Sequence, residues 1–159
     1  MHSSSIGRIE DVIERPVCVV SEGYFKLPGG EQCFKHYRDA YRSFTDAEAK
    51  CKLHNMALAQ PHDNIAAALR RYILDNFGDV VSTWIGAQAD GSVYRYLRDQ
   101  PPLTTDSHLW AADEPEGITS DWCLGLRTRS SQLKKNPNSP YVAYRCSVSY
   151  YTLCEVVMS

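Results

Sequence analysis

Residues 110–116 read WAADEPE, and residues 121–123 follow closely with DWC. The first stretch places Asp113 and Glu114 before Pro115 and Glu116 after it, and the second adds a fourth carboxylate, Asp121. A peptide bond to proline reaches the cis form at a cost of only about 0.5–1 kcal/mol, so Pro115 can hold both glutamates on one side of the chain. Calcium binds to clusters of oxygen ligands of this kind. The stretch therefore predicts a loop that binds a hard cation or a polyol.

The cysteines indicate the class of protein that carries this loop. They are Cys18, Cys33, Cys51, Cys123, Cys146 and Cys154. An even number without C-x-x-C spacing is typical of disulfides and not of a zinc ribbon or a redox motif. We therefore expect an oxidising, extracellular environment, although the spacing alone does not choose among the connectivities.

Length and charge predict one globular domain. The chain has 159 residues, of which 43% are hydrophobic, so it can bury a substantial core. Its net charge of −2 argues against binding to nucleic acid or anionic membranes through bulk charge. No apolar run approaches the roughly 20 residues of a membrane span, and no signal peptide is apparent. A disulfide protein must be exported, so we expect residues 1–17 to be a tag or linker, or a short neck helix built on Ile6, Ile9 and Ile13.

The first third of the domain predicts a hairpin and two helices. Aromatic residues flank a Gly-rich turn at 28–30, which indicates a hairpin that Cys18 and Cys33 could link. Thr45 and Glu48 form a capping-box pattern, which predicts a helix running to about residue 54. Helical spacing behind a proline predicts a second helix over 61–77.

The rest of the chain predicts short strands and loops. The expected strands are 83–86, 94–97, 123–126, 141–145 and 150–156. Helices followed by a run of strands indicate an α+β domain with antiparallel pairing.

At this point the residues carry a family resemblance. Trp84-Ile85-Gly86, the loop from Trp110, the cysteine at 123 and the ending Leu153-Cys154-Glu155 occur in one order. From Cys18 onward the chain resembles the long form of the C-type lectin-like domain. The resemblance implies two helices, antiparallel sheets, a long loop region and three disulfides. The implied disulfides are Cys18–Cys33, Cys51–Cys154 and Cys123–Cys146.

The resemblance also implies a calcium site that holds a sugar. Carried over by position, Glu114, Glu116 and Asp121 fall on ligand positions of that family. Val142 and Ala143 stand where it has an asparagine and an aspartate, and neither offers a side-chain oxygen. Because calcium needs about 6–8 oxygens, we expect no site here tighter than millimolar. Two functions stay open: a calcium-independent module for a protein or anionic ligand, and a calcium-dependent carbohydrate lectin with a depleted Glu-Pro-Glu site.

A basic segment follows the acidic one. Arg127, Arg129, Lys134 and Lys135 lie between Cys123 and Cys146, with no acid among residues 124–146. This pattern has three interpretations: a solvated loop, capture of an anionic glycan or acidic partner, or a cation that replaces calcium beside the carboxylates. Trp122 is a core residue or a ring for stacking against a sugar.

Nothing in the sequence predicts catalysis. There is no G-x-S-x-G elbow, phosphate loop or dinucleotide fingerprint, and the two glutamates lack the second wall of a glycosidase cleft. We expect a non-enzymatic binding module, secreted or part of a receptor ectodomain. Its ligand would be an extracellular protein or glycan, and a homo-oligomer stays open.

Overall fold

A computed structural model describes residues 16–129 and 138–157. The helical elements are η1 (Val20–Glu22), α2 (Phe44–Leu53), η2 (Asp63–Ile65) and α3 (Ala66–Phe77). The strands are β1 (Tyr24–Phe25), β2 (Phe34–Arg42), β3 (Ala57–Leu58), β4 (Ser82–Ala89), β5 (Val93–Tyr96), β6 (Leu103–Thr104), β7 (Trp122–Arg127), β8 (Tyr141–Arg145) and β9 (Tyr150–Glu155). In the described part of the chain, no helix is long and apolar enough to cross a membrane.

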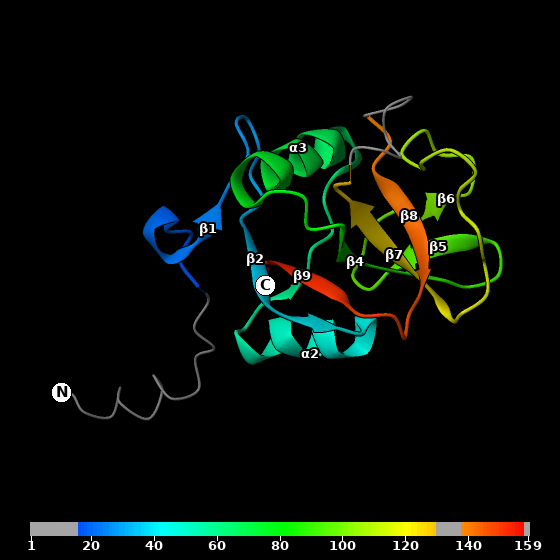
Figure 1. The fold of residues 1–159 in the computed structure, drawn as a ribbon, viewed down its shortest axis with the longest axis horizontal. Coiled ribbons are helices and arrows are strands. Elements are labelled where there is room, and N and C mark those ends of the chain that lie inside the picture. The colour runs from blue at the N-terminus through cyan, green and yellow to red at the C-terminus, as the bar shows by residue number, and fades with distance from the viewer. Residues whose placement is uncertain (1–15, 130–137, 158–159) are drawn as a thin grey trace.

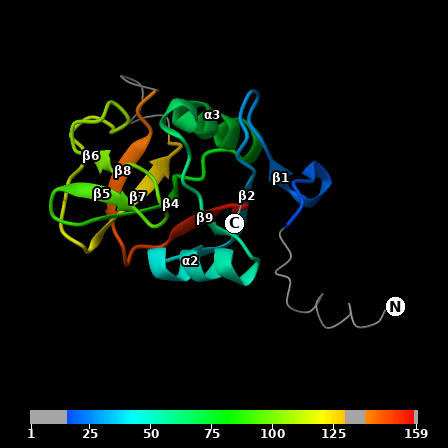
Figure 2. The ribbon, with the colours of Figure 1, turned by 180° about the vertical axis from the view of Figure 1, so that it is seen from behind.

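A twisted sheet runs through the middle of the molecule, with α3 on one side and α2 on the other (Figure 1). Its main order is β1-β2-β9-β4-β5-β6, and β7 pairs with β4 on one side and β8 on the other. Seen from behind, β5 to β8 gather at the end opposite β1 (Figure 2). The loop that carries the acidic residues lies at this end.

One strand pair differs from the antiparallel prediction. β4 and β9 are parallel, with Thr83 opposite Tyr151 and Trp84 opposite Thr152. Every other pair of strands in the described residues is antiparallel. The sheet is therefore mixed, because the chain makes a long crossover before β9 returns to the centre.

The two helices differ in their starts from the sequence prediction. The cap of α2 is Ser43, whose hydroxyl accepts the N–H of Asp46 at 3.3 Å, so the predicted capping box at Thr45 was wrong by two residues. The second helix begins at Ala66, after the short η2 turn, and not at Pro61. Both ends lie close to prediction, at Leu53 and Phe77.

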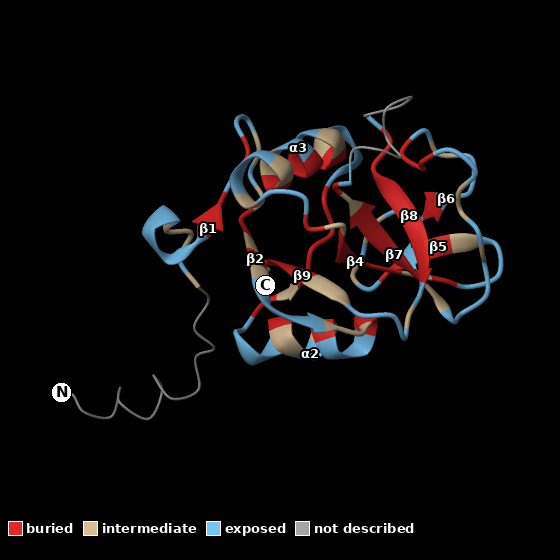
Figure 3. Ribbon diagram, in the orientation of Figure 1, coloured by how far each residue is buried: buried red, intermediate tan, exposed pale blue. Residues whose placement is uncertain are grey.

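The helices enclose two cores on opposite faces of the sheet. Leu69 and Ile73 of α3 are fully buried against the first, and burying such side chains stabilises the fold by about 1.5–3 kcal/mol each. Ala47 and Cys51 of α2 pack into the second, around Trp84. Figure 3 shows β4, β7 and β8 as mostly buried, so these strands form a rigid support for the loops beyond them.

All three disulfides implied by the resemblance are present. Cys18 bonds to Cys33, Cys51 to Cys154, and Cys123 to Cys146. The second joins α2 to β9 and encloses most of the domain. The third joins the start of β7 to the residue after β8, directly beside the acidic residues.

Candidate functional site

The acidic loop, residues 113–121, lies between β6 and β7. The Glu114–Pro115 peptide bond is cis. Glu114 is half-buried, whereas Glu116 and Asp121 are exposed. The two glutamates beside the proline therefore lie in different environments.

Glu114 is held by backbone N–H groups. Its Oε1 accepts the N–H of Ala143 at 3.0 Å and the N–H of Glu116 at 3.1 Å. Burial raises the pKa of the Glu114 carboxyl, and these two hydrogen bonds oppose that rise. The carboxylate thus joins the acidic loop to β8.

Asp121 is held by a cation of the protein itself. Its carboxylate forms an ion pair with Arg145 and accepts the hydroxyl of Thr119. The bond from Thr119 and the nearby guanidinium lower the pKa of Asp121, so the group is ionised at neutral pH. The guanidinium also lies 4.4 Å from the centre of the Trp122 ring, a cation–π distance.

The Trp122 ring packs inside the site. A Cβ built on Gly117 would lie 2.0 Å from an atom of this ring, so only glycine allows the backbone to approach so closely. The hydroxyl of Tyr94 donates to the Gly117 carbonyl from the other direction. Trp122 is half-buried, and the ring is in contact with Arg145 and the loop backbone. This arrangement fixes the acidic loop without any added group.

The predicted basic residues point elsewhere. Arg127 donates to the Tyr144 hydroxyl at 3.0 Å, and Arg129 pairs with Asp79 at 3.8 Å. Lys134 and Lys135 lie outside the described residues. The two described arginines therefore do not form ion pairs with the acidic loop.

An open cleft borders the acidic loop on the side of the β4–β5 hairpin. It is lined by Gln88, Asp90, Arg95, Thr119 and Ser120, among others. The Gln88 amide donates to the Ser120 carbonyl, and Arg95 pairs with Asp90. The polar groups of the cleft are thus largely paired with one another.

Comparison with known proteins gives a fold. No protein-family profile and no curated protein matches the chain. Many solved structures do. The TC14 C-type lectin of the tunicate Polyandrocarpa misakiensis superposes with a TM-score of 0.63 at 20% identity, covering 81% of this chain and 100% of its own. The chain has the C-type lectin-like fold.

Two further structures show the range of this fold. A calcium-independent type II antifreeze protein has a TM-score of 0.63 at 22% identity, covering 87% of this chain and 93% of its own. The C-type lectin domain of murine dendritic cell inhibitory receptor 2, solved in complex with an N-glycan, has a TM-score of 0.66 at 18% identity, covering 86% and 98%. Domains of the C-type lectin-like fold are in general non-enzymatic binding modules and are typical of extracellular proteins.

The donor set differs from that of the calcium site implied by the resemblance. Within residues 16–129 and 138–157, no three His, Cys, Asp or Glu side chains come together in a way that could hold a metal ion. Val142 and Ala143 are buried in β8, and the N–H of Ala143 already binds Glu114. A calcium ion would have to compete with Arg145 for Asp121 and with this N–H for Glu114. These residues do not fit a calcium site of that kind.

Arg145 is the residue that the sequence reasoning missed. It directly precedes Cys146 and lies opposite Trp122 in the β7–β8 pair. Because Cys146 bonds to Cys123, the neighbours of both cysteines must lie close together. With that disulfide implied, the sequence held a signal for the ion pair: Arg145 directly precedes Cys146, and Asp121 lies two residues before Cys123.

Proposed function

We propose that this C-type lectin-like domain is an extracellular module that binds a protein or glycan ligand without calcium. The observation that carries the proposal is the ion pair between Arg145 and Asp121. A calcium ion in the acidic loop would supply positive charge to its carboxylates, and here an arginine supplies that charge.

Glu114 supports the same proposal. Its Oε1 is taken up by two backbone N–H groups, so binding a metal through that oxygen requires breaking at least one hydrogen bond to a buried strand. Of the three carboxylates that the resemblance implies as calcium ligands, Glu116 is the exposed one that has no side-chain partner among the described residues. One carboxylate falls far short of the 6–8 oxygens that calcium prefers.

The ligand class draws support from structural neighbours. One of them was solved with an N-glycan, and another is described as calcium-independent. Together they make a calcium-free ligand site on this fold physically reasonable.

The test compares thermal unfolding in 2 mM calcium and in EDTA. For a site with a Kd of about 20 μM, this calcium concentration is about 100 times the Kd. Binding would then stabilise the fold by about 2.7 kcal/mol, which raises the Tm by several degrees. We expect no change. A reversible rise in Tm would support the alternative, a calcium-dependent lectin with a Glu-Pro-Glu site. A glycan and protein array run in EDTA then tests for ligands, and hits that appear only with calcium would also contradict the proposal.

A further inference from the structure

Arginines and tyrosines gather where four neighbouring strands end together. One end of the sheet brings together the end of β2, the start of β9, the start of β4 and the end of β7. The pairs Arg42–Tyr150, Thr83–Tyr151 and Ser82–Arg127 set this alignment. The arginine–tyrosine face is the surface across this end of the sheet. Arg38, Tyr41 and Tyr151 pack on the side that carries α3, Arg127 and Tyr150 pack on the other side around Tyr144, and Arg129 follows the end of β7.

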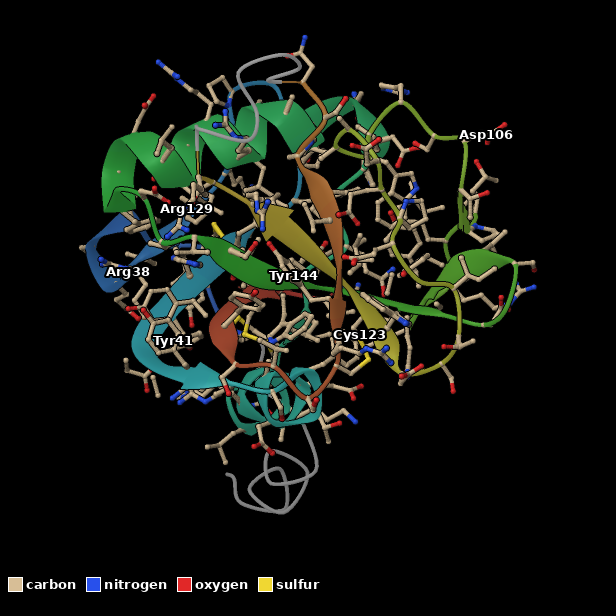
Figure 4. The ribbon with its side chains drawn as sticks, turned by 45° about the vertical axis from the view of Figure 1, so that its right-hand side comes forward. Arg38, Tyr41, Asp106, Cys123, Arg129 and Tyr144 are labelled. Atoms are coloured by element: carbon tan, nitrogen blue, oxygen red, sulfur yellow. A yellow bond between two sulfur atoms is a disulfide. The ribbon has the colours of Figure 1, made fainter. Side chains whose placement is uncertain are left out.

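This face lies apart from the tip of the long loop region. In Figure 4, Arg38, Tyr41 and Arg129 lie together at one end of the molecule, Tyr144 lies near the middle, and Asp106 lies at the opposite end. A ligand on this face would leave the loop around Asp106 free.

The tyrosines are packed in pairs, one stacked and one tilted. Tyr41 is 60% exposed, and its ring stacks on Tyr151 with centroids 4.5 Å apart and planes 11° apart. Tyr150 packs on Tyr144 at 4.4 Å. Rings held in this way lose little conformational entropy when a ligand packs on them. Tyr41 therefore presents a fixed, largely open aromatic surface.

The arginines are held by aromatic rings more than by acids. Arg38 lies 4.5 Å from the centre of the Phe77 ring, and Arg127 lies 5.6 Å from that of Tyr144. Among the described residues, neither has an ion-pair partner. Arg129 pairs only with Asp79, at 3.8 Å, and both side chains are about half exposed. Guanidinium groups fixed on rings keep N–H donors available for an incoming anion.

Few acids offset this charge. Asp39 and Asp79 border the face, and both are in ion pairs. The carboxylate of Asp39 is shared between Arg42 and Lys50, which lowers its pKa well below the usual range. The described part of the face thus has an excess of positive charge.

We propose that the arginine–tyrosine face binds an anionic polysaccharide, with sugar rings packed on Tyr41 and charged groups bound by Arg38, Arg127 and Arg129. β2 and β7 are separated by two strands, a distance of about 14 Å at ~4.8 Å per strand. A single sugar cannot span that distance, whereas a polymer with repeated anionic groups can. This inference rests on the proposed function, because a module without calcium needs another source of positive charge for its ligand.

The experiment measures binding of an immobilised heparin dodecasaccharide in EDTA at 50 and 200 mM salt. The test variant combines Arg38→Gln, Arg127→Gln and Arg129→Gln, and a second variant is Tyr41→Ala. The matched control combines Lys52→Gln, Arg71→Gln and Arg95→Gln, which removes three exposed cations from outside the face. Melting temperatures of all variants are compared first, and single arginine variants replace the triple if it unfolds.

We expect the triple variant to bind at least tenfold more weakly and Tyr41→Ala several-fold more weakly, with the control within about twofold of wild type. Binding by wild type should weaken steeply with salt. Equal losses in the test and control triples would overturn the proposal in favour of bulk charge. Tighter binding to polyglutamate than to heparin would overturn it in favour of an acidic protein. A third outcome is that neither protein binds heparin, while array ligands bind in EDTA equally well to the triple variant and to wild type. That outcome would overturn the proposed role of this face and leave the proposed function standing.

Discussion

Arg145 and Asp121 form an ion pair immediately beside the disulfide that joins β7 to the end of β8. The disulfide fixes the backbone at Cys123 and Cys146, and the ion pair fixes the loop that leads into it. The N–H of Cys146 also binds the carbonyl of Asp121 at 2.9 Å. The end of the acidic loop is therefore attached to β8 by a covalent bond, a backbone hydrogen bond and an ion pair.

Replacing Arg145 should loosen the loop more than it destabilises the domain. The ion pair is exposed, so Arg145→Gln should leave the free energy of unfolding almost unchanged. Hydrogen exchange of the amides in residues 116–122 should become faster, because local opening no longer breaks the ion pair. Arg95→Gln, which removes another exposed ion pair, is the control. Unchanged exchange in the loop would show that Arg145 does not hold it.

Glu114→Gln tests whether the half-buried carboxylate needs its charge. Burial raises the pKa of Glu114 in the folded protein, so folding favours the protonated form. That contribution is fully present below the pKa of the unfolded chain and is lost as pH rises through the folded pKa. A glutamine keeps an oxygen for the N–H groups of Ala143 and Glu116 and carries no charge.

We therefore expect Glu114→Gln to be as stable as wild type or more stable at pH 7, by less than about 1 kcal/mol after screening by solvent. The difference should shrink as pH falls below 4. Thermal unfolding over pH 3–8 measures it, with the exposed Glu116→Gln as control. A clear loss of stability at pH 7 would mean that a bound cation or another charged partner needs this carboxylate.

The sequence predicted most elements, and the family resemblance implied all three disulfides, but neither predicted the contacts that define the site. Aromatic and apolar runs located β4 and β7, and the cysteine pattern made the family resemblance specific. The parallel pairing of β4 with β9 has no local signal, because it depends on how the whole chain crosses over. The pairing of Asp121 with Arg145 likewise depends on the register of two strands. The arginine–tyrosine face could not be predicted either, since it joins the ends of strands far apart in sequence.

His36 should make the protein sensitive to acid. It lies between the rings of Phe77 and Tyr151, and neither ring nitrogen has a hydrogen-bond partner in the described structure. Burial, with the nearby Arg38 as a smaller cause, lowers the pKa of His36 to about 3. The stability due to the neutral ring is thus present above the unfolded pKa of about 6.5 and is lost as pH falls.

At pH 4.5 this linkage costs about 2–3 kcal/mol, at 1.36 kcal/mol per pH unit below the unfolded pKa. His36→Phe should remove that cost and also the two unpaired nitrogens, so the variant should be more stable than wild type, and more so at pH 4.5 than at pH 7. Denaturant unfolding at both pH values measures the difference. His54→Gln, at an exposed histidine, should keep the wild-type pH dependence. An equal effect of His36→Phe at both pH values would show that His36 is not the acid-sensitive group.

The disulfides should differ in their contributions to stability according to the length of chain that each one closes. Cys51 and Cys154 are 103 residues apart, whereas Cys18 and Cys33 are 15 apart. In the chain-entropy model, the longer loop stabilises the fold by about 4–5 kcal/mol and the shorter by about 3 kcal/mol. Cys51 and Cys154 are also fully buried between α2 and β9, so alanines there leave a cavity in the second core as well.

Cys51→Ala with Cys154→Ala should therefore lower the free energy of unfolding more than Cys18→Ala with Cys33→Ala, which affects the hairpin at the edge of the sheet. Denaturant unfolding of the two double variants measures this, with m-values compared to detect any change in the unfolded state. If the longer-loop variant does not fold, stepwise reduction of the wild type gives the same order. The short-loop disulfide, whose Cys18 is half-buried, should open before the bond between the fully buried Cys51 and Cys154. An equal or larger loss from removing the short-loop disulfide would mean that strain or residual structure, and not loop length, determines what each disulfide contributes.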